Sequence, residues 1–114
     1  MKNKLLSLLG ICRKAGKLVH GFDAVSESVK QGTAKLVLVS CDISPKTKKE
    51  IEFISSKTNT KVITAPVTMS GIEQKTGKRA GVLAILDDGL AKAVNEAAVR
   101  AGEEEYYDRK IQGA

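Results

Sequence analysis

"KLVLVS", residues 35–40, is an uninterrupted run of leucine and valine that starts after a lysine and closes on a serine. A run this short and this apolar is typical of a β-strand that is covered on both faces. It therefore predicts the central strand of a sheet. Two further runs, "KVITA" at 61–65 and "GVLAIL" at 81–86, have the same character, and a short extended piece at 17–20 completes four predicted strands.

The segments between these strands repeat their apolar residues with helical spacing. Ser44 before Pro45 is typical of a helix start, because serine caps the first turn and the fixed φ of proline suits it. Ser70 and Glu73 have the spacing of a capping box, and an aspartate at 87–88 can cap the final helix. Helices are predicted for residues 5–12, 22–31, 45–57, a short stretch near 70 and the residues after 88. This alternation predicts an α/β fold, a three-layer α/β/α sandwich around a mixed four-stranded sheet.

The length of 114 residues and the apolar content of 42% fit one domain that can bury a core. We assign residues 1–100 to this domain and residues 101–114 to a polar C-terminal extension that contains "EEEYYDRK". The first apolar run is broken by Ser7 and Gly10 and leads into basic residues, so we expect neither a signal peptide nor a membrane span.

The two cysteines, Cys12 and Cys41, stand beside aliphatic residues and far apart in the sequence. That setting favours buried, reduced thiols over a disulfide or a zinc site. We therefore expect both side chains to be buried and the protein to work in a reducing cytoplasm.

Charge is distributed unevenly along the chain. Residues 1–40 carry a net charge of +5, residues 41–80 carry +4 and residues 81–114 carry −3, which together give +6. A basic body with an acidic end favours a polyanionic partner, of which nucleic acid is the commonest. A soluble basic protein with solvated lysines would have the same composition. The positions of the charges therefore have to distinguish between these two interpretations.

Two basic segments contain closely spaced glycines: "RKAGKLVHGFDAV" at 13–25 and "GIEQKTGKRAG" at 71–81. Gly16 is predicted to end a helix, whereas Gly21 would give a ligand close access to the start of the next one. If the strands at 17–20 and 82–86 share a sheet, both segments emerge at the same end of it. The candidate RNA-binding residues from these segments are Lys14, Lys17, His20, Gly21, Lys75, Gly77, Lys78 and Arg79.

RNA is favoured over duplex DNA, because no predicted helix is basic enough to occupy a major groove. Catalysis is not expected. His20 has no Ser or Cys nearby to activate, and an aspartate at 87–88 is explained by capping. "GIEQKTGKRAG" is not a nucleotide-binding loop, because five residues rather than four separate Gly71 from Gly77. We expect no enzymatic activity, no cofactor and no metal site.

"GKLVHGFDAVSESVKQGTAKLVLVSCDISP" and "GKRAGVLAILDDGLA", at 16–45 and 77–91, resemble the ribosomal L-seven-Ae / L-thirty-e kink-turn RNA-binding family, especially its bacterial YlxQ-like branch. The resemblance runs from Leu5 to about Val94. It implies an α/β/α fold without enzymatic activity and binding to a kinked internal loop of RNA. It further implies that this is ribosomal RNA, bound in ribosome structure or assembly.

The family contacts RNA through a segment of pattern Gly-x-Asn-Glu-x-Thr-Lys. On this chain the segment starts at Gly21, and it adds Phe22, Asp23 and Ser26 to the candidate RNA-binding residues. The second family contact, the loop before the last strand, corresponds to residues 76–81.

On this chain Gly21 and the hydroxyl of Ser26 agree with the family pattern, whereas three positions depart from it. Asp23 stands where the family has Asn. Ala24 stands where the family has Glu, and Glu27 stands where it has Lys. We therefore expect ordinary kink-turn RNA to bind poorly. Two alternatives stay open: an RNA-targeting module that acts with a partner enzyme such as an RNA methyltransferase, and a protein-interaction or small-ligand domain whose function lies at strand ends near Asp42. The expected partners are RNA and a ribosomal particle, without a membrane, and the expected state is a monomer.

Overall fold

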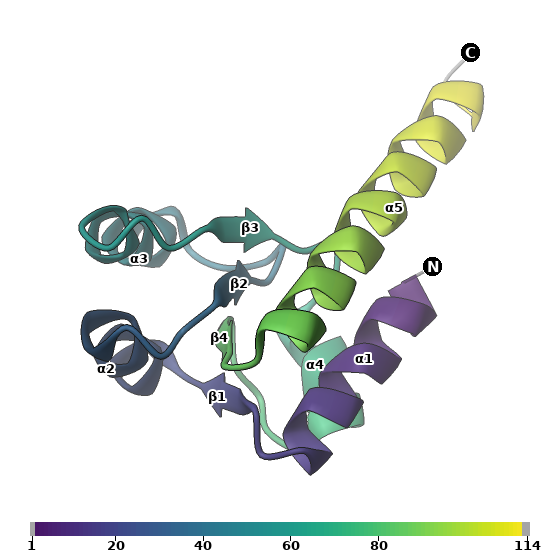
Figure 1. The fold of residues 1–114 in the computed structure, drawn as a ribbon. Helices are drawn as coiled ribbons and strands as arrows, with labels where there is room; N and C mark the ends of the chain where they lie inside the picture. The colour runs from purple at the N-terminus through teal and green to yellow at the C-terminus, as the bar shows by residue number, and fades with distance from the viewer. Residues whose placement is uncertain (1, 113–114) are drawn as a thin grey trace.

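The structure, a computed structural model, describes residues 2–112, and the side chains of residues 3–103 within them. In this part of the chain five helices alternate with four strands (Figure 1). Their order is α1 (Lys2–Lys14), β1 (Leu18–His20), α2 (Phe22–Gln31), β2 (Leu36–Val39), α3 (Pro45–Ser56), β3 (Val62–Thr64), α4 (Met69–Thr76), β4 (Val82–Ile85) and α5 (Asp88–Gln112). The four strands and the helices between them agree with the sequence prediction.

The four strands form one mixed sheet in the order β1-β4-β2-β3. β4 is antiparallel to both β1 and β2, and β3 is parallel to β2. β1, β2 and β3 therefore end at the end of the sheet where β4 begins. All residues of β2 and β4 are buried, which confirms that the "KLVLVS" run is central.

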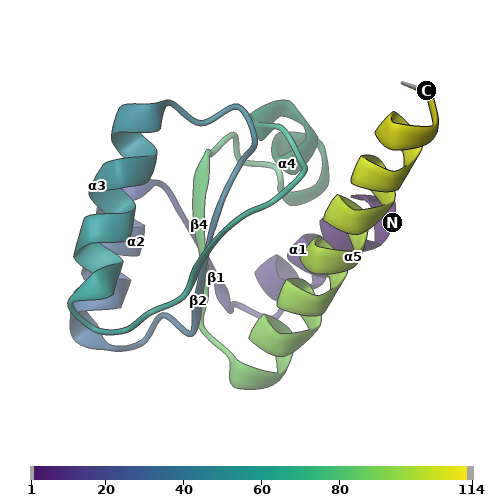
Figure 2. The ribbon, with the colours of Figure 1, turned by 90° about the horizontal axis from the view of Figure 1, so that it is seen from above.

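Helices cover both faces of the sheet. Figure 2 shows α2 and α3 on one face, and α1 and α5 on the other with α4 beside them. Each face has its own apolar core: Leu5 and Leu9 of α1 pack with Val94 of α5 on one side, and Val25 of α2 packs near Ile51 of α3 on the other. The predicted three-layer α/β/α sandwich is confirmed.

The helix caps were predicted well except at α4. The Ser44 hydroxyl accepts a hydrogen bond from the Thr47 N–H at 3.2 Å, and Asp87 accepts one from the Leu90 N–H at 2.8 Å. The predicted capping box that begins at Ser70 is wrong. Ser70 already lies inside α4, and the cap is Thr68.

The start of α4 is held by two side chains. The Thr68 hydroxyl accepts from the Gly71 N–H at 3.0 Å. The Asp42 carboxylate, at the end of the turn after β2, accepts from the Met69 N–H at 3.1 Å. Asp42 thus has a structural task, which explains a carboxylate at this strand end without a ligand.

The prediction for the cysteines is half confirmed. Cys12 is 0% exposed on the inner face of α1. Cys41 is exposed, so the prediction that it is buried is wrong. β2 ends at Val39, and Cys41 lies in the turn beyond it, where the chain leaves the sheet. Its apolar neighbours in sequence belong to the strand and do not cover it.

The backbone of α5 continues through residue 100 to Gln112 as one helix. Residues 101–112, part of the extension predicted from the sequence, are thus helical. Within the described part of the chain, no helix is both long enough and apolar enough to cross a membrane.

Candidate nucleic-acid interface

Gly21 lies where β1 gives way to α2. Its N–H donates to the Val82 carbonyl at 2.9 Å, which joins the end of β1 to the start of β4. Its backbone has φ 94° and ψ 151°, a conformation that is essentially restricted to glycine. A Cβ added here would meet nothing within 4 Å, so this backbone faces open space.

The first turn of α2 has no side-chain cap. Its leading backbone N–H groups therefore have no side-chain acceptor, and the helix dipole makes this end attractive to anions. Phe22 is half-buried against the core under α2, whereas Asp23 is exposed in the first turn. The start of α2 thus offers both N–H donors and a carboxylate acceptor to a ligand.

The loop before β4 is tied to the end of β1 by one buried hydroxyl. Thr76, 1% exposed, donates to the Ile72 carbonyl at 2.8 Å. The same hydroxyl oxygen accepts from the Lys78 N–H at 3.4 Å and lies within hydrogen-bond distance of His20 Nε2, at 3.3 Å. This arrangement fixes Lys78 next to His20 and confirms that the two basic, glycine-bearing segments meet.

Arg13, from the last turn of α1, lies over Gly77. A Cβ added at Gly77 would stand 2.5 Å from Arg13 Nη1, so the absence of a side chain there lets the guanidinium approach. Gly77 has φ 81°, which also favours glycine. Arg13 was not among the predicted site residues. Its place beside Lys14 in the last turn of a helix was the signal, but sequence cannot decide which of two adjacent residues faces the loop.

The pKa of the His20 imidazole reflects the charges around it. Burial lowers the pKa of its imidazole, and the nearby cations Lys78 and Arg13 lower it further. The ring is therefore neutral at pH 7, and the positive charge of the surface comes from the guanidinium and the ammonium.

The remaining predicted residues fall into two groups. Lys14, Lys75 and Arg79 are exposed around the same surface, and Arg79 forms an ion pair with Glu73 at 3.8 Å. Lys17 and Ser26 are not brought to it. The Lys17 carbonyl accepts from the Leu86 N–H at the opposite end of β1.

Ser26 is 7% exposed on the inner side of α2, so its hydroxyl is not open to a ligand in this structure. Ala24 and Glu27 lie on the outer side of the same helix and are exposed. Glu27 accepts a hydrogen bond from the Gln31 amide at 2.9 Å. Asp23, Ala24 and Glu27, which depart from the family pattern, are therefore all exposed to solvent.

We name the surface formed by Arg13, His20, the start of α2 at Gly21, and residues 77–79 the loop surface. It can neutralise phosphates through the guanidinium groups of Arg13 and Arg79 and the ammonium of Lys78, and it can donate backbone N–H groups. Among residues 3–103, no three His, Cys, Asp or Glu side chains converge on a point where they could hold a metal ion. This chemistry suits binding of an anionic polymer.

Comparisons with known proteins identify related sequences. A sequence profile of the Ribosomal protein L7Ae/L30e/S12e/Gadd45 family matches residues 3–95. The RNA-binding protein YlxQ of Enterococcus faecium is 32% identical over 95 residues, which cover 83% of this chain and 91% of that protein. The large ribosomal subunit protein eL30 of Neurospora crassa is 34% identical over 83 residues, or 71% of this chain and 76% of that protein.

Solved structures share the fold. A protein of unknown function from Bacillus halodurans C superposes with a TM-score of 0.76 at 26% identity, over 82% of this chain and 94% of that one. The 15.5kD RNA binding protein of Giardia lamblia superposes with a TM-score of 0.70 at 17% identity, over 86% of this chain and 84% of that one. At that identity the second likeness shows the fold alone.

Proposed function

This chain belongs to the ribosomal protein L7Ae/L30e/S12e/Gadd45 family, and from that membership we propose that it is a non-enzymatic protein that binds structured RNA. The proposed target is a kink-turn-like internal loop, in ribosomal RNA, and the proposed role lies in ribosome structure or assembly. The relatives named above are themselves an RNA-binding protein and a ribosomal subunit protein.

The observation that carries the proposal is the convergence of two remote segments on the loop surface. His20 and Lys78 are joined through one Thr76 hydroxyl, and Gly21 is bonded to Val82. Two loops held side by side can contact a bent RNA backbone from both sides. A sharply kinked RNA presents such a bend together with bases that are free of stacking partners.

The roles of the residues follow from their chemistry. Arg13 and Lys78 would bind phosphate oxygens, since both are cations that stand beside a close-approach glycine. The uncapped N–H groups at the start of α2 would bind a further phosphate or a base edge. The exposed carboxylate of Asp23 would accept from a base amino group. Gly21 would let the sugar–phosphate backbone approach without meeting a side chain.

The test is the salt dependence of binding to purified bacterial ribosomal RNA. Each cation that binds a phosphate releases counterions, so log affinity falls linearly with log salt. Lys78→Ala with Arg79→Ala should weaken binding and flatten the slope by about one to two units.

The matched control is Lys46→Ala with Lys49→Ala, which removes the same charge from the exposed side of α3. The control should leave the slope close to that of the wild type. A slope that is unchanged in the loop variant, or equally changed in the control, would remove residues 77–79 from the RNA-binding site. A wild-type protein that binds no ribosomal RNA at low salt would refute the proposed function itself.

A further inference from the structure

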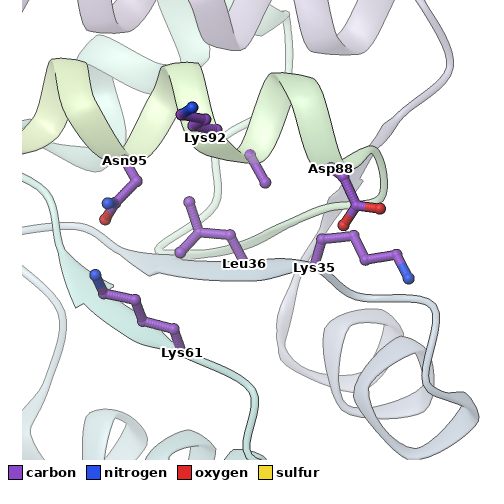
Figure 3. Close-up of a pocket in the computed structure, with 7 residues that line it drawn as sticks. Lys35, Leu36, Lys61, Asp88, Lys92 and Asn95 are labelled. Atoms are coloured by element: carbon purple, nitrogen blue, oxygen red, sulfur yellow. The ribbon is translucent and has the colours of Figure 1, made fainter.

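A second positively charged site lies at the other end of the sheet. It is a hollow of about 230 Å³ between the first turns of α5 and the residues that lead into β2 and β3 (Figure 3). Its walls are formed by Lys35, Leu36, Lys61, Asp88, Ala91, Lys92 and Asn95. β4 begins beside the loop surface and ends beside this hollow, so the two sites stand on opposite ends of the sheet.

Three lysines supply the charge of the hollow. Lys35, Lys61 and Lys92 are all exposed, and they come from three separate parts of the chain: the residue before β2, the residue before β3, and α5. Asp88 is the single acid among the lining residues, which leaves an excess of two positive charges. Among residues 3–103 the one ion pair is that of Arg79 with Glu73, so no carboxylate of these residues pairs with any of the three ammonium groups. Lysines gathered from separate elements around a concave surface suit an anion with several oxygens.

Asn95 adds a requirement that a bare anion does not meet. Its side-chain oxygen is buried and has no hydrogen-bond partner among the residues that the structure describes. Figure 3 shows its amide pointing from α5 toward the Lys61 ammonium on the opposite wall. A buried polar group without a partner costs free energy, which a ligand that hydrogen-bonds to it would recover. The Asn95 amide lines the hollow, and a turn of this side chain would bring its covered oxygen to a ligand there. A ribose 2′-hydroxyl both donates and accepts, so it would pair with either atom of the amide.

We propose that this hollow, the lysine hollow, is a second RNA-binding site that holds the sugar–phosphate backbone. The three ammonium groups would bind phosphate oxygens and Asn95 would bind a ribose hydroxyl. The inference rests on the proposed function and extends it. β4 has four residues, so the two sites are separated by about 13 Å along the strand at ~3.3 Å per residue. The protein would therefore hold two segments of a folded RNA at opposite ends of its sheet.

The first test neutralises the hollow with Lys35→Gln, Lys61→Gln and Lys92→Gln. Affinity for purified bacterial ribosomal RNA should fall at least tenfold at low salt. The slope of log affinity against log salt should decrease by about two, because each bound phosphate contributes about 0.7 to 0.9. Circular dichroism and thermal unfolding should be unchanged, since all three side chains are exposed.

The matched control is Lys4→Gln, Lys46→Gln and Lys49→Gln, which removes the same charge from exposed positions outside the hollow. An equal loss in this control would show an effect of net charge alone and would overturn the proposal. Full affinity and an unchanged slope in the hollow variant would overturn it too, while the proposed function would stand as long as the wild type binds ribosomal RNA.

The second test separates the hydroxyl from the phosphates. Asn95→Leu removes the amide without changing the charge, so RNA affinity should fall severalfold while the salt slope stays constant. Adenosine monophosphate provides the same chemistry from a free nucleotide. If it shifts the amide NMR signals of Lys35 and Lys61 at micromolar concentration, and ribosomal RNA does not shift them, the hollow binds a small nucleotide and the RNA assignment is wrong.

Discussion

Replacing Gly21 by alanine tests the loop surface at its most constrained point. The backbone of Gly21, at φ 94° and ψ 151°, lies in a region that costs other residues about 1–3 kcal/mol. No atom lies within 4 Å of the added methyl group, so the cost comes from the backbone alone. For a chain of this size we expect the melting temperature to fall by about 4 °C for each kcal/mol.

RNA binding should suffer as well, because the methyl group would project into the space through which we propose that the RNA backbone approaches. We expect affinity for ribosomal RNA to fall at least tenfold, or about 1.4 kcal/mol. Thermal unfolding gives the stability, and fluorescence anisotropy at a temperature where all variants are folded gives the affinity.

Gly32→Ala is the matched control. Gly32 also has positive φ, at 77°, and its added methyl group also meets nothing within 4 Å, but it lies at the other end of α2. It should lose about 1–2 kcal/mol of stability and keep its RNA affinity. If both variants bind RNA equally well, or lose affinity equally, Gly21 is not part of the RNA-binding surface. If Gly21→Ala is as stable as the wild type, the backbone argument is wrong.

Three further predictions concern single surfaces or groups. Ala24→Glu with Glu27→Lys restores the family pattern at two exposed positions. In a gel-shift titration this variant should bind a standard kink-turn RNA tenfold or more tightly than the wild type, with little change in stability. Unaltered binding would show that this side of α2 does not contact the RNA bases. Burial is the main cause of the lowered pKa of His20 in the folded state, so the unfolded chain binds a proton first as the pH falls below about 6.5, and the folded protein loses stability there. Denaturant unfolding at pH 7.5 and 5.5 should therefore show a smaller decrease in the free energy of unfolding for His20→Gln than for the wild type. A thiol reagent should modify the exposed Cys41 quickly in the native protein and Cys12 only after unfolding. The reason is that burial and the nearby Asp87 carboxylate raise the pKa of the Cys12 thiol. Equal rates of modification would contradict the packing of α1.

Much of the fold could be predicted because it depends on local chemistry. The strands are apolar runs that are short for a helix, so their length already favours a strand. Gly16 and Gly32 both take the positive φ that ends a helix. Ser44 and Pro45 mark a helix start that the structure contains. Each of these signals is complete within a few residues, so no knowledge of the rest of the chain is needed.

The errors arise where the outcome depends on distant partners. Thr68 rather than Ser70 caps α4, because the chain turns after Val67 has been buried in the core, which the sequence around Ser70 does not show. Cys41 is exposed because the sheet ends two residues before it. Arg13 belongs to the loop surface only because α1 packs beside α4.

Because the loop surface needs residues that are far apart in the sequence, it can form only after the later ones have been synthesised. β1 is an outer strand that pairs with β4 alone, so residues 18–20 have no strand partner until residues 82–85 have been synthesised. A nascent chain that already displays Gly21 still lacks Lys78 and the Val82 carbonyl that holds Gly21 in place. The loop surface is therefore completed late in synthesis, and a product truncated before residue 82 lacks the contacts that hold Gly21 and Lys78 together.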